Sequence, residues 1–266
     1  MAQKITVKTL QKYKDENKKF SMLTAYDYST AKYIDEAGVD SILIGDSLGM
    51  VILGYENTCS VTMDEMLIFT TAVARGVTNA FVVADMPFLS YHTDLATAIL
   101  NGGKLIQAGA NAVKIEGCND YIIDVVNRMT QSGIPVVGHI GFTPQSVNTL
   151  GGYKVQGKTE DALINIKNQA IALQNAGAVA IVLEMMPENA AKCVDECISI
   201  PTISCGAGKY CTGQVVVSDD MLGKYGEFKP KFVRRYGDMR KFILDCATQY
   251  DRDVKSGDFP NSEEVY

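Results

Sequence analysis

Several short apolar segments of this 266-residue chain end on side chains that could take part in catalysis. They are SILIGDS with Asp46 and Ser47, FVVADMP with Asp85, AVKIEG with Lys114 and Glu116, IPVVGHIG with His139, and AIVLEMMP with Glu184. In a barrel of parallel strands the carboxyl ends of all strands open on one face, so residues far apart in the sequence meet in one pocket. The pattern predicts an enzyme with its site on that face.

Three of these residues are carboxylates that could share a metal ion. Asp46, Asp85 and Glu116 would converge in a site without histidine ligands, which suits a hard cation such as Mg²⁺ that also holds water and substrate oxygens. A single aspartate after a strand can equally accept backbone hydrogen bonds in a turn. The metal hypothesis therefore depends on all three carboxylates meeting.

The remaining polar residues suit an anionic substrate and a proton transfer. Lys114 and Glu116 lie two apart on one strand and point to the same face, either as a buried ion pair or as a substrate cation beside a metal ligand. Glu184, flanked by apolar residues, could act as a general base, pair with Lys114 or cap the next helix. His139 is either a satisfied core residue or a group close to the substrate, which the neighbouring glycines would allow to approach.

An alternating helix–strand repeat positions these residues. A helical segment, a glycine and an apolar run recur at Gly38, Gly109, Gly133 and Gly177, and glycine after a helix is the usual left-handed stop. Near-continuous apolar runs are typical of parallel strands covered on both faces. We expect strands near 20–26, 41–46, 80–85, 111–116, 134–139, 178–184, 201–205 and 214–218.

Eight such strands predict an α/β fold with a single (β/α)8 barrel over residues 1–266, an N-terminal helix and a helical C-terminal tail. An open doubly wound sheet is the alternative, which the lack of a GxGxxG motif after the first strand disfavours. One helix is expected near 62–78, opened by Thr62 and Glu65 in capping-box spacing, and another near 159–176.

Composition narrows the partners and the compartment. The net charge of −6 and the absence of a basic stripe argue against nucleic-acid binding. No apolar run is long enough for a transmembrane helix, and the polar N-terminal segment does not read as a secretory signal. The seven cysteines lack metal-site spacing, so we expect reduced thiols in the cytoplasm.

Over about residues 6–245, seven motifs follow one another along the chain and resemble those of the ketopantoate hydroxymethyltransferase family. They are GDSLGMVILGYENT, VTMDEM, VVADMPFLSY, AVKIEG, GHIGFTPQSVNTLGGYKVQGK, AIVLEMMP and GAGKYCTGQVVVSDDMLG. The resemblance implies a barrel of the phosphoenolpyruvate/pyruvate type. It also implies transfer of a hydroxymethyl group from 5,10-methylenetetrahydrofolate to 3-methyl-2-oxobutanoate, forming 2-dehydropantoate for pantothenate and coenzyme A by magnesium-assisted enolate formation.

The resemblance also carries residue roles and an assembly. It implies that Asp46, Asp85 and Glu116 gather around Mg²⁺, and that Asp46, Ser47, Asp85, Lys114 and His139 form the substrate site. Glu184 would be the proton acceptor. A homo-oligomer, a decamer of two pentameric rings, is implied as well.

Three residues in two segments depart from the family pattern, and two other functions remain open. Thr212 stands where the family favours an acid, and Ser204 and Cys205 stand where it favours an isoleucine–glycine pattern. A carbon–carbon lyase acting on a small oxoacid is one alternative, although its usual KxCG-type cysteine motif is absent. A barrel that has lost catalysis and serves for binding is the other.

Overall fold

Eight parallel strands close into a barrel in the computed structural model, which describes residues 4–225 and 229–266. The strands pair in sequence order, and β8 closes onto β1. They are β1 Phe20–Thr24, β2 Ser41–Ile44, β3 Phe81–Asp85, β4 Ala112–Glu116, β5 Val136–Gly141, β6 Ala180–Glu184, β7 Thr202–Cys205 and β8 Gly213–Val216. The prediction of a (β/α)8 barrel is confirmed.

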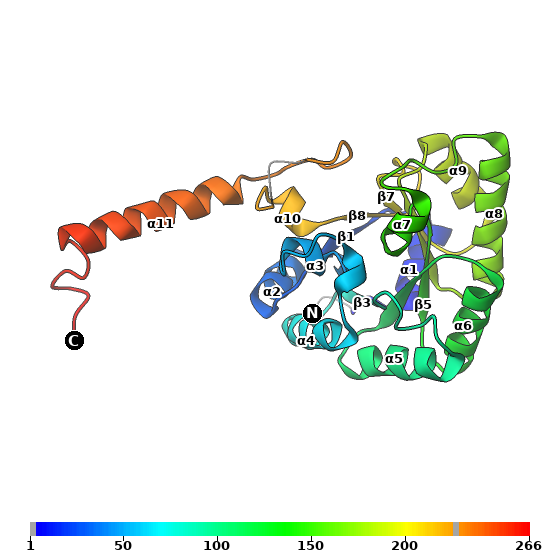
Figure 1. The fold of residues 1–266 in the computed structure, drawn as a ribbon, viewed down its shortest axis with the longest axis horizontal. Helices are drawn as coiled ribbons and strands as arrows, with labels where there is room; N and C mark the ends of the chain where they lie inside the picture. Colours follow the sequence, from blue (N-terminus) through cyan, green and yellow to red (C-terminus); the bar gives the residue numbers. More distant parts are fainter. Residues whose placement is uncertain (1–3, 226–228) are drawn as a thin grey trace. The chain divides into compact units, whose positions relative to one another are not determined.

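Helices follow the first six strands and surround the barrel (Figure 1). The longer ones are α2 Tyr28–Glu36, α4 Met63–Gly76, α5 Leu95–Gln107, α6 Asp120–Gln131, α8 Glu160–Asn175 and α9 Glu188–Cys197. The predicted capping box of α4 is present, with Thr62 and Glu65 exchanging hydrogen bonds. All four glycines of the repeat, from Gly38 to Gly177, have positive φ angles, as a left-handed helix stop requires.

Shorter elements occupy the loops that follow β2, β5 and β8. They are α3 Leu48–Val51, η1 Thr58–Ser60, η2 Pro144–Ser146, α7 Val147–Leu150 and α10 Ser218–Met221. Residues 206–212, all of them described, join β7 to β8 without a helix, whereas the repeat predicts one between every pair of strands.

Two apolar cores hold the barrel. One lies inside it and combines residues such as Met22, Val83 and Val137 from the strands with Leu10 from α1 Val7–Asp15. The other lies between the strands and the surrounding helices, and includes Ile44, Met66 and Leu105. Burial of both strand faces explains why the strands read as unbroken apolar runs.

Helix α1 closes the N-terminal end of the barrel. Leu10 is buried in the inner core, and Lys14 Nζ lies 2.8 Å from Asp195 Oδ1. Gln11 Nε2 donates to the Ser199 carbonyl at 2.8 Å. The opposite end, where the strands finish, is left for the site.

The chain divides into two compact units, the first ending at Val217 and the second running from Ser218 to Tyr266. The barrel lies in the first unit. The second contains α10 and the helical tail expected from the sequence, α11 Met239–Ser256, which ends at Gly257 with a positive φ angle. That residues 1–266 act as one domain stays a prediction.

None of the helices in the described ranges has the length and apolar character needed to cross a membrane.

Candidate active site

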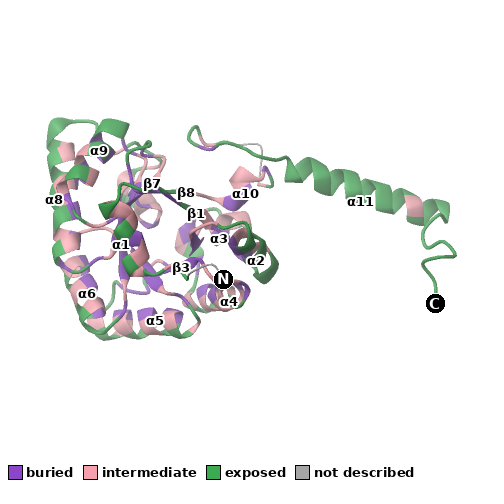
Figure 2. Cartoon of the chain, turned by 180° about the vertical axis from the view of Figure 1, so that it is seen from behind, coloured by how far each residue is buried: buried purple, intermediate pink, exposed green. Residues whose placement is uncertain are grey.

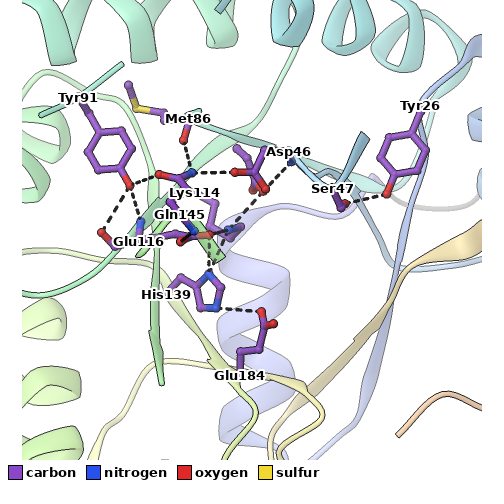
Figure 3. Close-up of polar contacts among 11 residues, drawn as sticks. Tyr26, Asp46, Ser47, Met86, Tyr91, Lys114, Glu116, His139, Gln145 and Glu184 are labelled. Atoms are coloured by element: carbon purple, nitrogen blue, oxygen red, sulfur yellow. Dashed lines mark hydrogen bonds and ion pairs between the residues drawn. The ribbon is translucent and has the colours of Figure 1, made fainter. Parts of the chain in front are cut away.

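The residues singled out at the strand ends converge at the carboxyl end of the barrel (Figure 3). Asp85, Glu116 and Glu184 are the last residues of β3, β4 and β6. Direct contacts link six of the seven predicted site residues in a chain: Asp46, Asp85, Lys114, Glu116, His139 and Glu184. Ser47 stands at the edge of this cluster, where its hydroxyl lies 2.8 Å from the Tyr26 hydroxyl.

Strand register brings acids and bases side by side. Asp85 pairs with Lys114 between β3 and β4, and Glu116 pairs with His139 between β4 and β5. Lys114 Nζ consequently lies 3.3 Å from Asp85 Oδ2, 3.4 Å from Glu116 Oε1 and 3.1 Å from His139 Nδ1. The lysine thus contacts two predicted metal ligands and the histidine.

The surrounding carboxylates keep both cations protonated at neutral pH. Burial lowers the pKa of Lys114, but Asp85 and Glu116 outweigh it and raise the pKa above its usual value. Burial and Lys114 lower the pKa of His139, but contacts with Glu116 and Glu184 raise it to about 9. In return, Lys114 and His139 overcome the effect of burial on Glu116 and lower its pKa to about 2.

Asp46 and Asp85 are the carboxylates best suited to a metal ion. Burial, together with Asp85 and Glu116, raises the pKa of Asp46 well above its usual value, and burial also raises the pKa of Asp85. Within the described residues, Asp85 Oδ1 is buried and has no hydrogen-bond partner. Two desolvated carboxylates with a spare oxygen fit a divalent cation that completes its shell with substrate and water.

Glu116 is already engaged by the protein. Its Oε1 contacts Lys114 and His139, and its Oε2 accepts the Gln145 backbone N–H at 3.0 Å. Within the described ranges, no set of three or more acidic, histidine or cysteine side chains is arranged to hold a metal ion. The oxygens of Asp46 and Asp85 fit a cation such as Mg²⁺, and the ligand roles of Asp46, Asp85 and Glu116 all stay predictions.

Glu184 is the least enclosed of the clustered acids. Its side chain is 15% exposed, and its Oε2 lies 3.2 Å from Nε2 of His139, which is 2% exposed. This contact is close enough for an ion pair, although Nε2 has no partner in hydrogen-bond geometry among the described residues. A carboxylate at the open side of a buried cationic group is placed to reach a bound molecule.

A family model described as ketopantoate hydroxymethyltransferase matches residues 4–262. The chain belongs to the ketopantoate hydroxymethyltransferase family. A Clostridium botulinum protein (strain Loch Maree / Type A3) named 3-methyl-2-oxobutanoate hydroxymethyltransferase is 52% identical over 262 residues, covering 98% of this chain and 95% of its own. A Caldicellulosiruptor bescii protein of the same name is 51% identical over 263 residues, covering 99% of both chains. As a member of this family, the chain is a transferase enzyme.

Solved structures share the barrel at much lower identity. Phosphonopyruvate hydrolase in complex with oxalate and Mg²⁺ matches with a TM-score of 0.63 at 12% identity, covering 98% of this chain and 93% of that one. A 2,3-dimethylmalate lyase of the PEP mutase/isocitrate lyase superfamily matches with a TM-score of 0.60 at 13% identity, covering 98% and 91%. These likenesses confirm the fold type expected for the family.

Three residues of the site were missed by the sequence analysis. Gln145 contacts the Asp46 carboxylate, Tyr91 contacts the Glu116 backbone, and Tyr26 contacts Ser47. Tyr26 follows β1 closely, so the rule that polar residues follow strands could have found it. Gln145 and Tyr91 lie in loops inside the quoted family motifs GFTPQS and PFLSY, and no spacing rule singles them out.

The departures from the family pattern fall at two different places. Cys205 pairs in register with Glu184, and the buried Ser204 hydroxyl accepts the Ala207 N–H at 3.0 Å, which closes a tight turn. The carbonyl of Thr212 accepts the Phe20 N–H at 3.1 Å, at the start of β1 and β8. The Thr212 departure therefore lies at the end of the barrel away from the candidate site, whereas Cys205 is adjacent to it.

Proposed function

We propose that this enzyme transfers a hydroxymethyl group from 5,10-methylenetetrahydrofolate to 3-methyl-2-oxobutanoate, forming 2-dehydropantoate in pantothenate biosynthesis. The relatives at about half identity carry the name of this reaction. The observation that carries the proposal is the contact of the partly exposed Glu184 with His139. His139 is the first of three buried residues in contact, followed by Lys114 and then Asp85, which we call the buried row.

The buried row provides recognition of an oxoacid. The Lys114 ammonium balances the substrate carboxylate, while the Ser47 hydroxyl and His139 donate hydrogen bonds to substrate oxygens. Asp46 and Asp85, with Glu116 as the predicted third carboxylate, would hold Mg²⁺. When bound there, the ion supplies Lewis-acid polarisation of the oxo group, which makes the neighbouring carbon more acidic.

Glu184 then moves the proton. Its carboxylate removes the proton from C3 of the oxoacid, and the electron pair of that C–H bond passes into the enolate. C3 forms a bond to the methylene carbon of the folate, and a water oxygen forms the second new bond to that carbon. The two C–N bonds break with their electron pairs staying on the folate nitrogens, which take up the C3 proton and one proton of the water. The imidazolium of His139, adjacent to Glu184, holds the base in place and offsets its charge.

Exchange of the C3 proton in D2O, without folate, tests this role. We expect Glu184→Gln to slow the exchange by at least about a hundredfold, because a positioned general base contributes that much. Binding of the oxoacid should remain. The control is Glu188→Gln, a glutamate in the first turn of α9 at the same end of the barrel. Exchange at the wild-type rate in Glu184→Gln would remove Glu184 as the base.

We also propose that the enzyme is a cytoplasmic homo-oligomer, a decamer as in the family resemblance. All seven cysteines lie in described segments and are free thiols, which supports a reducing compartment. Figure 2 shows α11 exposed along its length, and none of its residues is buried. Its exposed Phe242, Ile243, Tyr250 and Val254 lie on one stripe of the helix, which supports burial against another copy of the chain.

A further inference from the structure

Gln145, in the loop that follows β5, contacts the loops that follow β2 and β3 and the last residue of β4. It lies in η2, and 5% of the residue is exposed. Its Nε2 donates to Asp46 Oδ2 at 2.8 Å and to the Met86 carbonyl at 2.9 Å. Its backbone N–H donates to Glu116 Oε2 at 3.0 Å (Figure 3). One residue thus contacts two of the predicted metal carboxylates.

Tyr91 determines which way the Gln145 amide points. The Tyr91 hydroxyl accepts the Glu116 backbone N–H at 3.2 Å. Its own proton goes to Gln145 Oε1 at 2.7 Å, because the other acceptor within reach, the Glu116 carbonyl, is much farther away at 3.5 Å. The reversed amide would place its oxygen against the Asp46 carboxylate and the Met86 carbonyl, which have no proton to offer. Since Tyr91 is fully buried, water does not replace this hydroxyl.

The Gln145 side-chain amide binds one of two carboxylates that repel each other, those of Asp46 and Asp85. Asp85 Oδ2 is taken by the Asp46 backbone N–H at 3.0 Å and by Lys114, which leaves the buried Oδ1 without a partner in the described structure. The Gln145 amide holds Asp46 Oδ2 on the other side. Among the described residues no other hydrogen bond to Oδ2 is observed, so loss of this bond would free the Asp46 carboxylate to turn away from Asp85.

We propose that Gln145, oriented by Tyr91, is a positioning residue that holds the Asp46 carboxylate in the orientation in which Asp46 and Asp85 together bind a divalent cation. The inference rests on the proposed magnesium role of these aspartates. Partners behind the ligands of a metal site set its affinity, and their loss typically weakens binding by about 10- to 100-fold.

The test measures Mg²⁺ binding to the full chain by calorimetry and Mn²⁺ binding by EPR, both without substrate. We expect Gln145→Met, which keeps the length of the side chain and removes the amide, to weaken Mg²⁺ binding by about 10- to 100-fold. Catalysis should recover at high Mg²⁺, which a misfolded site would not allow. The control is Gln174→Met, which removes an amide whose Oε1 accepts the Ser199 N–H at 2.7 Å at the closed end of the barrel.

A second variant keeps the proposal open to contradiction should Gln145→Met fail to fold. Tyr91→Phe removes only the hydroxyl and should weaken Mg²⁺ binding in the same direction but less. Tyr13→Phe, which removes a hydroxyl bonded to Asp40 at the closed end, should leave Mg²⁺ binding unchanged.

The possible results distinguish the positioning role of Gln145 from the metal-binding role of Asp46 and Asp85. Wild-type Mg²⁺ affinity in the folded Gln145 and Tyr91 variants would overturn the positioning role alone. A wild-type protein that binds neither Mg²⁺ nor Mn²⁺ would overturn the proposed metal role, and the positioning role with it.

Discussion

Four carboxylates face one lysine and one histidine in the candidate site. With Lys114 and His139 protonated and all four acids ionised, the cluster would carry two negative charges, which a divalent cation would balance. Without the ion, the repulsion appears instead in the raised pKa values of Asp46 and Asp85, where burial is the largest cause. The side chains of the site are therefore arranged to bind a cation, and their repulsion without the ion lowers the stability of the folded protein.

Asp46→Asn should stabilise the protein in EDTA. Removing a buried charge that Asp85 and Glu116 repel should raise the free energy of unfolding by about 1–2 kcal/mol at neutral pH. Because the folded pKa of Asp46 is raised, the cost of its charge is absent below the unfolded pKa and grows as the pH rises toward the folded one. The gain over wild type should therefore be larger near about pH 7.5 than near about pH 4.5.

Urea unfolding at the two pH values measures this gain. The exposed Asp64→Asn, in the first turn of α4, should show no comparable gain. The same Asp46→Asn protein should lose Mg²⁺ binding. An Asp46→Asn protein less stable than wild type in EDTA would contradict the account of repulsion.

At the scale of elements, Gly141 lets β5 and β6 approach beside the proposed base. Gly141 has a φ of +95°, and the Phe142 N–H donates to the Glu184 carbonyl at 2.9 Å. A Cβ on Gly141 would overlap that carbonyl oxygen and come within 2.8 Å of Met186 Cε. Only glycine accommodates both the angle and the contact.

Gly141→Ala should therefore displace Glu184. We expect a loss of about 1–3 kcal/mol of stability, from strain and overpacking, and a slower exchange of the substrate C3 proton. Gly103→Ala is the matched control, because a Cβ there meets no atom within 4 Å and lies in helix α5, where alanine is favoured. Wild-type stability and exchange in Gly141→Ala would show that β6 tolerates the shift.

The sequence predicted the strands better than it predicted the loops. Continuous apolar runs and left-handed glycines located the eight strands, because burial on both faces and the helix stop leave local signals. The glycines of the helix-free connection at 206–212 indicate a turn after the seventh strand, whereas the short helices such as α3 and η2 left no local signal. Their conformations depend on contacts such as the two bonds of the Gln145 amide, which join residues far apart in the sequence. That dependence is why Gln145 and Tyr91 were missed while Asp46 and Glu184 were found.

At the scale of the whole molecule, the proposed assembly depends on α11. Phe242→Glu, on the apolar stripe, should lower the molar mass measured by light scattering, because a charge would be buried in the interface between copies. Thr248→Glu, on the opposite side of the helix, should leave the mass unchanged. An unchanged mass for Phe242→Glu would exclude this stripe as an essential interface.

Helix α1, which closes the N-terminal end of the barrel, affects the order in which substrates bind. With Leu10 of α1 packed into the inner core, both substrates of the proposed reaction must enter and leave by the same end. In the proposed reaction the oxoacid binds beside the buried Lys114, so the bulky folate would sit above it and block its exit. We therefore expect compulsorily ordered binding, in which the oxoacid enters first and its product is the last to leave.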